Sequence, residues 1–183
     1  MSVAPAPILE TERLILRLPE AEDFDAWAAF SADEEAMRYL GGAQERAVAW
    51  RGMCTMTGAW TVRGFSMFSV VEKATGRWVG RLGPWQPEGW PGTEVGWGLA
   101  RDVWGRGYAT EGATAAMDYA FDVLGWTEAV HTIEPANTGS QAVARRLGST
   151  ILRQGKMPAP FQDLTLDVWG QTREQWLARR AAR

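Results

Sequence analysis

The order of apolar and polar residues predicts a strand followed by helices in the first third of the chain. Leu14, Leu16 and Leu18 alternate along residues 13–18, as expected for one face of a strand. A helix is then expected after Pro19, whose acidic neighbours suit a first turn. A short helix should start at the capping-box pattern of residues 31–34, and a longer one should cover residues 44–60.

The period changes in the middle of the chain to one typical of strands. Residues 65–72 and 77–85 form a predicted hairpin, followed by a loop rich in Pro and Gly at residues 84–92 and a strand over 93–99. Apolar residues then recur at helical spacing up to Leu124, in a helix that should begin near Ala109. The remaining prediction is strand 128–133, helix 140–147, strands 150–154 and 163–168, and a short helix capped by Thr172. This pattern indicates one mixed α/β domain.

Composition excludes several classes of protein. The 183 residues carry 19 basic and 22 acidic side chains, a net charge of −3, and 46% are hydrophobic. A disordered chain is excluded, a slight acidity argues against nucleic-acid binding, and no run of about 18 apolar residues predicts a membrane span. The first residues do not resemble a signal peptide. We expect a cytoplasmic protein with a loose tail at 1–8, a domain at 9–170 and a short C-terminal helix or tail at 171–183.

Single copies of cysteine and histidine limit the chemistry. Cys54 and His131 cannot form a disulfide framework, and they make a protein-held metal site improbable, so no metal is expected. Cys54 is expected in the core of its helix beside Met53, which argues against a covalent acyl-cysteine. His131 is expected to be structural, because no nucleophile elbow accompanies it and Ser140.

The strand at residues 94–99 is unusual because two glycines flank a carboxylate on one face. Alternation places Glu94, Gly96 and Gly98 together, so that face should be nearly bare. Glycine in a strand marks a bulge or the close approach of a ligand or backbone. Glu94 is therefore a candidate general base if partial burial raises its pKa. The alternative is an exposed or ion-paired strand carboxylate.

A second glycine pair precedes the long helix. Gly105 and Gly107 lie where free N–H groups and the helix dipole favour an anion, and Arg106 adds a positive charge. A diphosphate suits this position, although the sequence fits neither a P-loop nor a Rossmann fingerprint. The alternative is that these glycines only turn a corner.

The motifs resemble a known family. The sequence WGRGYATE at residues 104–111, preceded by EVGWGL at 94–99, is similar to the acetyl-coenzyme A signature of the GNAT superfamily of N-acetyltransferases. The branch of the ribosomal-protein N-terminal acetyltransferases RimJ and RimL is the most similar, because ETERLILR at 10–17 and EPANTGS at 134–140 also match it. The resemblance extends from about residue 9 to 168.

The resemblance implies an α/β (α+β) fold, namely a single GNAT-like domain with a central mixed, mostly antiparallel sheet that is splayed at the cofactor site and flanked by helices. It implies acetyl-coenzyme A as co-substrate, with its pyrophosphate on loop N–H groups and its pantetheine arm against the strand. The binding residues so implied are Trp97, Gly98, Leu99, Gly105, Arg106, Gly107, Tyr108, Ala109, Thr110 and Asn137. Trp104 departs from the Gln or Arg usual in the family.

The implied reaction is direct attack of an amine on the thioester. It needs a base or a water chain, an oxyanion donor and an acid for the thiolate. Glu94 is the candidate base. The tyrosine that many members use as the acid is replaced by Ala144, and the RimL-like branch points to Ser140 instead. Asn137 and Ser140 also suit helix capping.

Two functions stay open at this point. The first is an N-acetyltransferase that acts on a primary amine, either a protein N-terminus or a small amine, amino acid or antibiotic. The second is a non-catalytic module that binds or senses acyl-coenzyme A. The loop 84–92 and the segment 155–162 are expected to border the acceptor site and to make it aromatic, through Trp85, Trp90 and Phe161. A homodimer is also left open.

Overall fold

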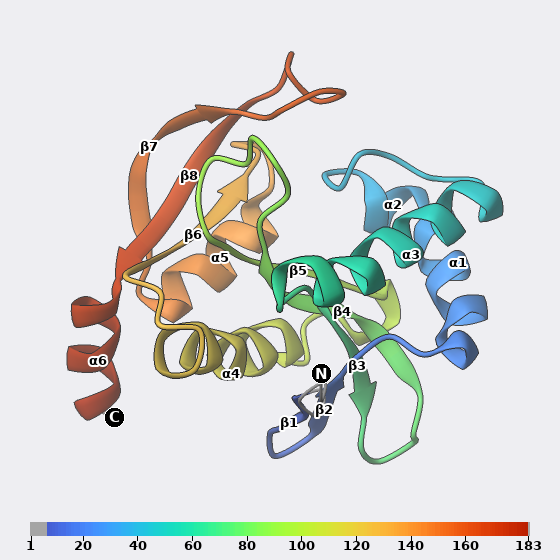
Figure 1. Ribbon diagram of the computed structural model, residues 1–183, viewed down its shortest axis with the longest axis horizontal. Coiled ribbons are helices and arrows are strands. Elements are labelled where there is room, and N and C mark those ends of the chain that lie inside the picture. The colour runs from blue at the N-terminus through green and yellow to red at the C-terminus, as the bar shows by residue number, and fades with distance from the viewer. Residues whose placement is uncertain (1–6, 183) are drawn as a thin grey trace.

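One open sheet forms the centre of the molecule. The computed structural model describes residues 7–182, so residues 1–6 of the expected loose tail and residue 183 lie outside the described residues. Within that range eight strands pair in the order β1-β2-β3-β4-β5-β6-β8-β7 (Figure 1). Their bounds are β1 (Leu9–Glu10), β2 (Leu14–Arg17), β3 (Phe68–Glu72), β4 (Trp78–Trp85), β5 (Glu94–Leu99), β6 (Glu128–Ile133), β7 (Thr150–Lys156) and β8 (Thr165–Thr172).

The sheet separates between its fifth and sixth strands. β5 and β6 run parallel and share one register pair, Glu94 opposite Val130. The other neighbouring strands of the described chain are antiparallel, and β4 pairs with β5 over six positions. The predicted mixed, mostly antiparallel sheet is therefore confirmed, and β5 and β6 separate on either side of this pair.

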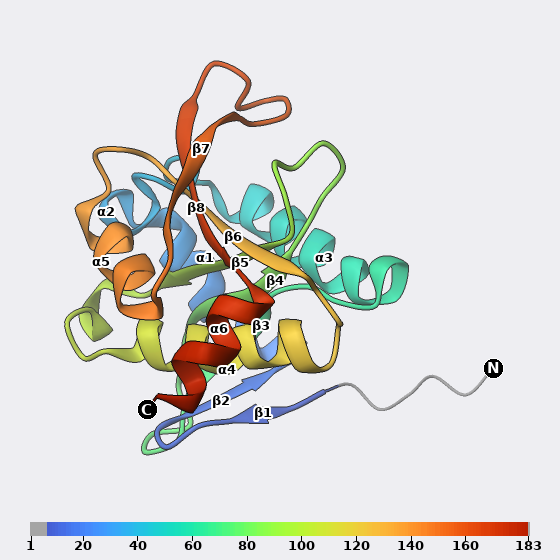
Figure 2. The same ribbon diagram turned by 90° about the vertical axis from the view of Figure 1, so that its left-hand side faces the viewer.

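Helices cover both faces of this sheet (Figures 1 and 2). Phe30 and Leu40 press on β5 at Gly98 from the side of the N-terminal helices, whereas α4 packs on the other face, where Gly112 lies against Leu82. A Cβ on Gly112 would lie 2.5 Å from Leu82 Cδ2, so this glycine allows the close packing that the small residues of the helix predicted. The helices are α1 (Phe24–Ala32), α2 (Glu34–Met37), α3 (Arg46–Arg63), α4 (Tyr108–Asp122), α5 (Thr138–Leu147) and α6 (Arg173–Ala181).

The two larger apolar clusters of the described residues hold these layers together. The larger one lies between the sheet and α4, where Phe68, Leu82 and Met117 are fully buried, and Trp176 of α6 belongs to it. The smaller one joins α1 and α3 to the sheet through Trp27 and Trp78. Burying each such side chain stabilises the fold by about 1.5–3 kcal/mol. No helix of residues 7–182 is both long and apolar enough to cross a membrane.

Some predicted details are wrong or incomplete. Cys54 is exposed rather than buried, because α3 turns mainly Ala49, Met53 and Trp60 toward the core. The short strand β1 had no alternating pattern to reveal it. β7 and β8 are both longer than the two predicted strands. β7 extends to Lys156 and β8 begins at Thr165.

Candidate active site

A cavity of about 300 Å³ lies where β5 and β6 diverge. Both predicted catalytic residues, Glu94 and Ser140, line it, and so do Trp97 and Asn137. Loop 86–93 and the connection 157–164 of the β7–β8 hairpin lie on the same side of the molecule (Figures 1 and 2). Arg153 of β7 links the hairpin to the loop by donating to the Pro91 carbonyl at 2.8 Å. The wall from these two segments includes Trp90, Met157, Phe161 and Leu164.

Glu94 is a buried carboxylate with several donors around it. Its side chain is held by the backbone N–H of Thr132 at 3.1 Å, by the Thr132 hydroxyl at 2.9 Å from Oε2, and by the indole N–H of Trp90. Burial raises the pKa of Glu94 above its ordinary value, and these hydrogen bonds offset the rise only in part. The alternative of an exposed or ion-paired carboxylate is therefore wrong, because Glu94 is buried and forms no ion pair in the described chain.

The glycines beside Glu94 do not leave the bare face that the sequence predicted. A Cβ on Gly96 would lie 2.8 Å from Met67 Cε, and one on Gly98 would lie 2.9 Å from Leu40 Cδ1. Protein side chains from the helical layer therefore occupy the space that the missing side chains free. The alternation was interpreted correctly, but the occupant was not, because a strand pattern does not show what packs against it.

Ser140 lies in the first turn of α5, opposite β5. Its hydroxyl oxygen accepts from Trp97 Nε1 at 3.2 Å, so the hydroxyl hydrogen stays available for another acceptor. Asn137 is the N-cap of this helix, since its Oδ1 accepts from the Ser140 backbone N–H at 3.1 Å. The capping interpretation thus holds for Asn137, whereas Ser140 is the capped residue.

Ala144, at the position of the missing tyrosine, is surrounded by other side chains. Ala144 is fully buried against Ile133 and Trp169, so a phenol there would have no room. Another tyrosine lines the cavity: Tyr39, just after α2, donates its hydroxyl to the Ala136 carbonyl at 3.3 Å. Sequence reasoning missed Tyr39, because 97 residues separate it from that partner.

The loop before α4 presents a row of free N–H groups. Gly105 and Gly107 have φ angles of 75° and 82°, a left-handed backbone that strongly favours glycine, and no side chain caps the helix. The N–H groups of residues 105–110 donate to no acceptor within residues 7–182, and the first helical bond of this turn is from Glu111 to the Gly107 carbonyl. Consecutive free N–H groups at a helix N-terminus form an anion-binding concavity. The residues of this loop therefore fit a diphosphate.

Ion pairs and hydrogen bonds from neighbouring segments hold this loop in place. Arg13 of β1–β2 donates to the Arg106 carbonyl at 3.0 Å and pairs with Glu111 at 2.6 Å. Tyr108 donates its hydroxyl to the buried Glu72 at 2.7 Å, and Arg106 approaches the same carboxylate at 3.4 Å. Hydrogen bonds from Thr75 and Tyr108 lower the pKa of Glu72. Sequence reasoning placed the loop correctly but missed these supports.

Trp97, Gly98 and Leu99, the three residues expected beside the pantetheine arm, do not all direct their backbone groups to the same side of β5. The carbonyls of Val95 and Leu99 accept from His131 and from Trp104 Nε1, at 2.7 and 2.9 Å. By strand alternation Trp97 points its N–H and C=O the same way, into the gap that β6 leaves. Gly98 turns toward β4, since its carbonyl approaches Gly80. The open edge therefore consists of the Trp97 backbone and the Leu99 N–H.

Arg81 of β4 is another residue of the cavity that the sequence did not indicate. It is partly buried, lines the same cavity as Glu94, and donates to Met67 Sδ at 3.0 Å. Its guanidinium lies 5.8 Å from the ring centre of Trp27, and it forms no ion pair with the described carboxylates. Burial lowers the pKa of Arg81 to about 10, against the opposing effect of the Glu94 charge. It is therefore still a cation at neutral pH.

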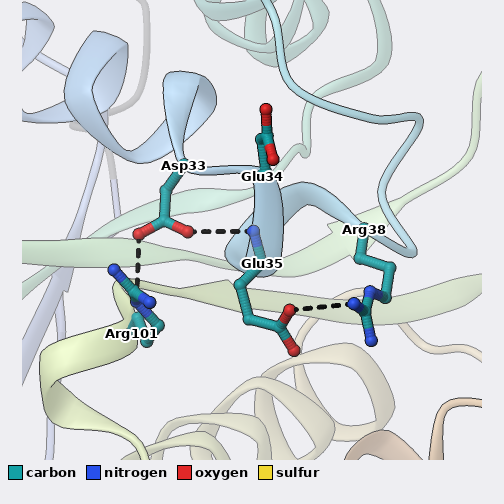
Figure 3. A pocket seen from close by; sticks show the side chains of 5 residues that line it. All are labelled: Asp33, Glu34, Glu35, Arg38 and Arg101. Atoms are coloured by element: carbon teal, nitrogen blue, oxygen red, sulfur yellow. Dashed lines mark hydrogen bonds and ion pairs between the residues drawn. The ribbon is translucent and has the colours of Figure 1, made fainter.

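A second hollow, near α2, differs in character (Figure 3). It is lined by charged residues, and its two arginines are already matched: Arg101 pairs with Asp33 at 3.2 Å and Arg38 with Glu35 at 3.2 Å. These are exposed surface ion pairs, which are weak and screened by salt. The hollow offers no unpaired cation.

His131 is structural, as predicted. Nδ1 lies 2.7 Å from the Val95 carbonyl and Nε2 lies 3.0 Å from the Ser149 hydroxyl. Because a carbonyl only accepts, Nδ1 carries the hydrogen and Nε2 accepts from Ser149. Burial lowers the pKa of His131 to about 4. Residues 7–182 contain no cluster of three or more His, Cys, Asp or Glu side chains that could bind a metal.

Comparison with known proteins identifies the family. Residues 13–150 match the family described as acetyltransferase (GNAT) domain. The chain is 33% identical over 135 residues to the uncharacterized N-acetyltransferase p20 of Bacillus licheniformis, covering 72% of this chain and 76% of that protein. The protein therefore belongs to the GNAT family and is an acetyltransferase. Members of this family generally use acetyl-coenzyme A.

Solved structures agree with this fold. An acetyltransferase from Agrobacterium tumefaciens superposes with a TM-score of 0.80 at 32% identity, over 93% of this chain and 95% of that one. The ribosomal alpha-N-protein acetyltransferase RimL superposes with a TM-score of 0.74 over 91% of this chain and 94% of that one, at 15% identity. The second likeness shows the fold alone.

Proposed function

We propose that the protein is an acetyl-coenzyme A-dependent N-acetyltransferase that transfers an acetyl group to a primary amine by direct attack on the thioester. The observation that carries the proposal is the pairing of a buried carboxylate, Glu94, with a donor hydroxyl, Ser140, in one cavity beside the gap between β5 and β6. When bound, acetyl-coenzyme A supplies an acetyl group activated as a thioester.

The coenzyme is assigned to backbone groups. The free N–H groups of residues 105–110 bind the pyrophosphate, with Arg106 adding charge, and the Trp97 backbone and the Leu99 N–H bind the pantetheine amides in the gap beside β5. Asn137 keeps α5 capped, so that its N-terminus points toward the thioester.

Glu94 acts as the general base. An ammonium entering the cavity gives one proton to Glu94, whose raised pKa brings it closer to that of the amine. The free amine nitrogen then bonds to the thioester carbon, the carbon–sulfur bond breaks, and the thiolate takes up the second proton of the amine. Thr132 and Trp90 hold the carboxylate in place throughout.

Ser140 receives the leaving group. Its hydroxyl oxygen is fixed by Trp97, so its hydrogen is free to donate to the thiolate, and the positive end of the α5 dipole acts in the same direction. The thiolate needs this help, because the buried Ala144 leaves no tyrosine at that point of the helix.

The test is acetyl-dependent thiol release. Acetyl-coenzyme A should raise the melting temperature, and free thiol should appear only when an amine acceptor is added. Absence of stabilisation at millimolar coenzyme would reject the proposal. Stabilisation without thiol release from any amine, in the wild type as in Glu94→Gln and Ser140→Ala, would favour the alternative of a non-catalytic acyl-coenzyme A sensor.

A further inference from the structure

An enclosed cation without an anionic partner lies in the proposed acceptor cavity. Most arginines of the described chain pair with carboxylates, such as Arg77 with Asp102 at 2.6 Å. Arg81, which is more enclosed, has instead the thioether of Met67 at 3.0 Å. Some exposed arginines of the described chain, such as Arg51 and Arg146, also form no ion pair, but they face solvent, whereas Arg81 is partly buried in the cavity.

Such an arrangement is energetically unfavourable unless something else supplies the anion. A guanidinium has five N–H donors, and a thioether is a weak acceptor. The rings of Trp27 and Phe30 lie 5.8 and 6.0 Å away, near the limit at which a cation is attracted to an aromatic face. A desolvated charge is normally paired, so the missing anion is expected on the molecule that enters the cavity.

Arg81 and Glu94 lie on the same face of the sheet. Arg81 is in register with Gly98 and Trp85 with Glu94, so the two charged residues project from the same face of the β4–β5 pair. The side chain of Met67 links them, since it touches Arg81 and covers Gly96 beside Glu94. Four residues of strand, about 13 Å, separate the two backbone positions, and the long arginine side chain spans part of that distance.

The two charges do not neutralise each other. No Arg81 nitrogen lies within 4.0 Å of a Glu94 oxygen, although Glu94 is the carboxylate whose charge acts on Arg81. Glu94 has its donors from Trp90 and Thr132 instead. One cavity is therefore lined by both an anionic and a cationic side chain, which are not paired with each other.

Building on the proposed function, we infer that the acceptor is a small amino carboxylic acid with an apolar body. Its amino group lies at Glu94, and its carboxylate accepts two parallel hydrogen bonds from Arg81, the geometry that guanidinium and carboxylate favour. The apolar part lies against Trp85, Trp90 and Phe161. A cavity of about 300 Å³ is at the lower end of the range for small-molecule sites.

This substrate class differs from a protein N-terminus. The first residue of a polypeptide carries an amide where a free amino acid carries its carboxylate, so Arg81 would face a neutral carbonyl. A carboxylate pairs with a guanidinium roughly twice as strongly as a neutral acceptor does. The Arg81 site therefore selects against peptides and for free amino acids.

The experiment compares matched acceptors. Thiol release from acetyl-coenzyme A is measured with L-tryptophan, L-leucine and γ-aminobutyrate, with the carboxamide of each, and with a short peptide that begins with leucine. The proteins are the wild type, Arg81→Gln, Arg81→Lys and, as control, Arg77→Gln, which removes an exposed arginine away from the cavity.

We expect at least one acid to be acetylated with a kcat/KM roughly 10- to 100-fold above that of its carboxamide, as for loss of one charged hydrogen-bond pair. Arg81→Gln should abolish that preference mainly through KM, because Arg81 contacts a group that does not react. Arg81→Lys should keep part of the preference, and Arg77→Gln all of it. A structural role for Arg81 would lower the rates of acids and carboxamides equally.

Carboxamides or the peptide acetylated as well as the acids by the wild type would overturn the inference and leave the proposed function intact. An equal effect of Arg81→Gln on acids and carboxamides would overturn it too. Should Arg81→Gln fail to fold, which its melting temperature shows, the wild-type comparison and Arg81→Lys still decide. Absence of transfer to every acceptor tested would overturn the inference, and the proposed function is then judged separately by stabilisation with acetyl-coenzyme A.

Discussion

The loop before α4 and the cavity beside Glu94 serve the two halves of the proposed reaction, and they are built differently. The loop offers the backbone N–H groups of six consecutive residues. The cavity is lined by side chains from β4, β5, β6, the start of α5, the segment after α2 and the β7–β8 hairpin. One site is made by local chain geometry, and the other by the meeting of distant segments.

This difference indicates which of the two sites is able to vary between members of the family. A backbone site tolerates many side chains as long as glycine permits the left-handed turns, so one coenzyme site suits many members of a family. A side-chain site changes with each residue that lines it. The acceptor half is therefore where members of the family are expected to differ, and where Arg81 stands.

The largest effect is expected at the centre of the cavity. Glu94→Gln should lower the rate of acetyl transfer by roughly 10²- to 10⁴-fold, because the amide cannot take up a proton. The melting-temperature shift caused by acetyl-coenzyme A should stay close to that of the wild type, since the free N–H groups of the loop are untouched. Glu128→Gln, on neighbouring β6, is the matched control with unchanged rate.

The same carboxylate predicts a pH dependence. The base is active when Glu94 is ionised, so kcat/KM should fall as the pH drops through its raised pKa, above the ordinary value for a glutamate. Coenzyme affinity should not follow this titration. A pH profile of kcat/KM that falls only near the ordinary glutamate pKa would contradict the assigned environment.

A second pH effect concerns the stability of the splayed strands. His131 is neutral in the folded protein down to about pH 4, whereas the unfolded chain takes up a proton near pH 6.5. The stability it contributes is complete above pH 6.5 and is lost as the pH falls to 4, by about 3 kcal/mol. Unfolding of the wild type and His131→Gln by denaturant between pH 7 and 4 checks this, and parallel curves would contradict it.

A smaller effect is expected at the loop. Gly107→Ala places a side chain at a φ of 82°, a strain of roughly 1–2 kcal/mol, and should weaken coenzyme binding about tenfold as the N–H groups shift. Gly125→Ala introduces similar strain at a φ of 69° far from the loop. It should lower the melting temperature similarly but leave coenzyme affinity unchanged. Equal affinities in the two variants would count against the backbone site.

The smallest effect is expected for the leaving-group donor. Ser140→Ala should lower kcat by roughly tenfold, the equivalent of one hydrogen bond to the thiolate. Tyr39→Phe is the informative comparison, because Tyr39 is a second hydroxyl of the cavity that does not bind Glu94. A larger loss in Tyr39→Phe than in Ser140→Ala would move the acid role from α5 to the segment after α2.

The same contrast explains what could be predicted from the sequence. The loop 105–110, the strand with Glu94 and the helix with Ser140 were identified, because each is a local pattern of glycines, alternation or capping residues. Trp90 was expected at the acceptor site, but its hydrogen bond to Glu94 was not predicted, and Thr132 was missed because a hydrogen bond between distant strands leaves no local signal. Arg81 looked like an ordinary strand arginine, and only the tertiary packing shows that it lacks a carboxylate.

Errors in the fold have a similar origin. Cys54 was expected in the core because its neighbours are apolar, yet α3 buries few of its residues and presents Cys54 to solvent. The hairpin β7–β8 was predicted too short, since β7 is exposed along nearly all its length and shows no clear alternation. The length of an edge strand depends on pairing with its neighbouring strand, and this pairing leaves no pattern in the local sequence.

The tip of the β7–β8 hairpin has a consequence for engineering. Met157, Phe161 and Leu164 reach the cavity from a connection that lies between two strands and makes no part of the coenzyme loop. Exchange of residues 157–164 between related enzymes would thus replace one wall of the proposed acceptor site while the loop before α4 keeps its sequence. The hairpin is a natural place at which to retarget acetylation to amines of another shape.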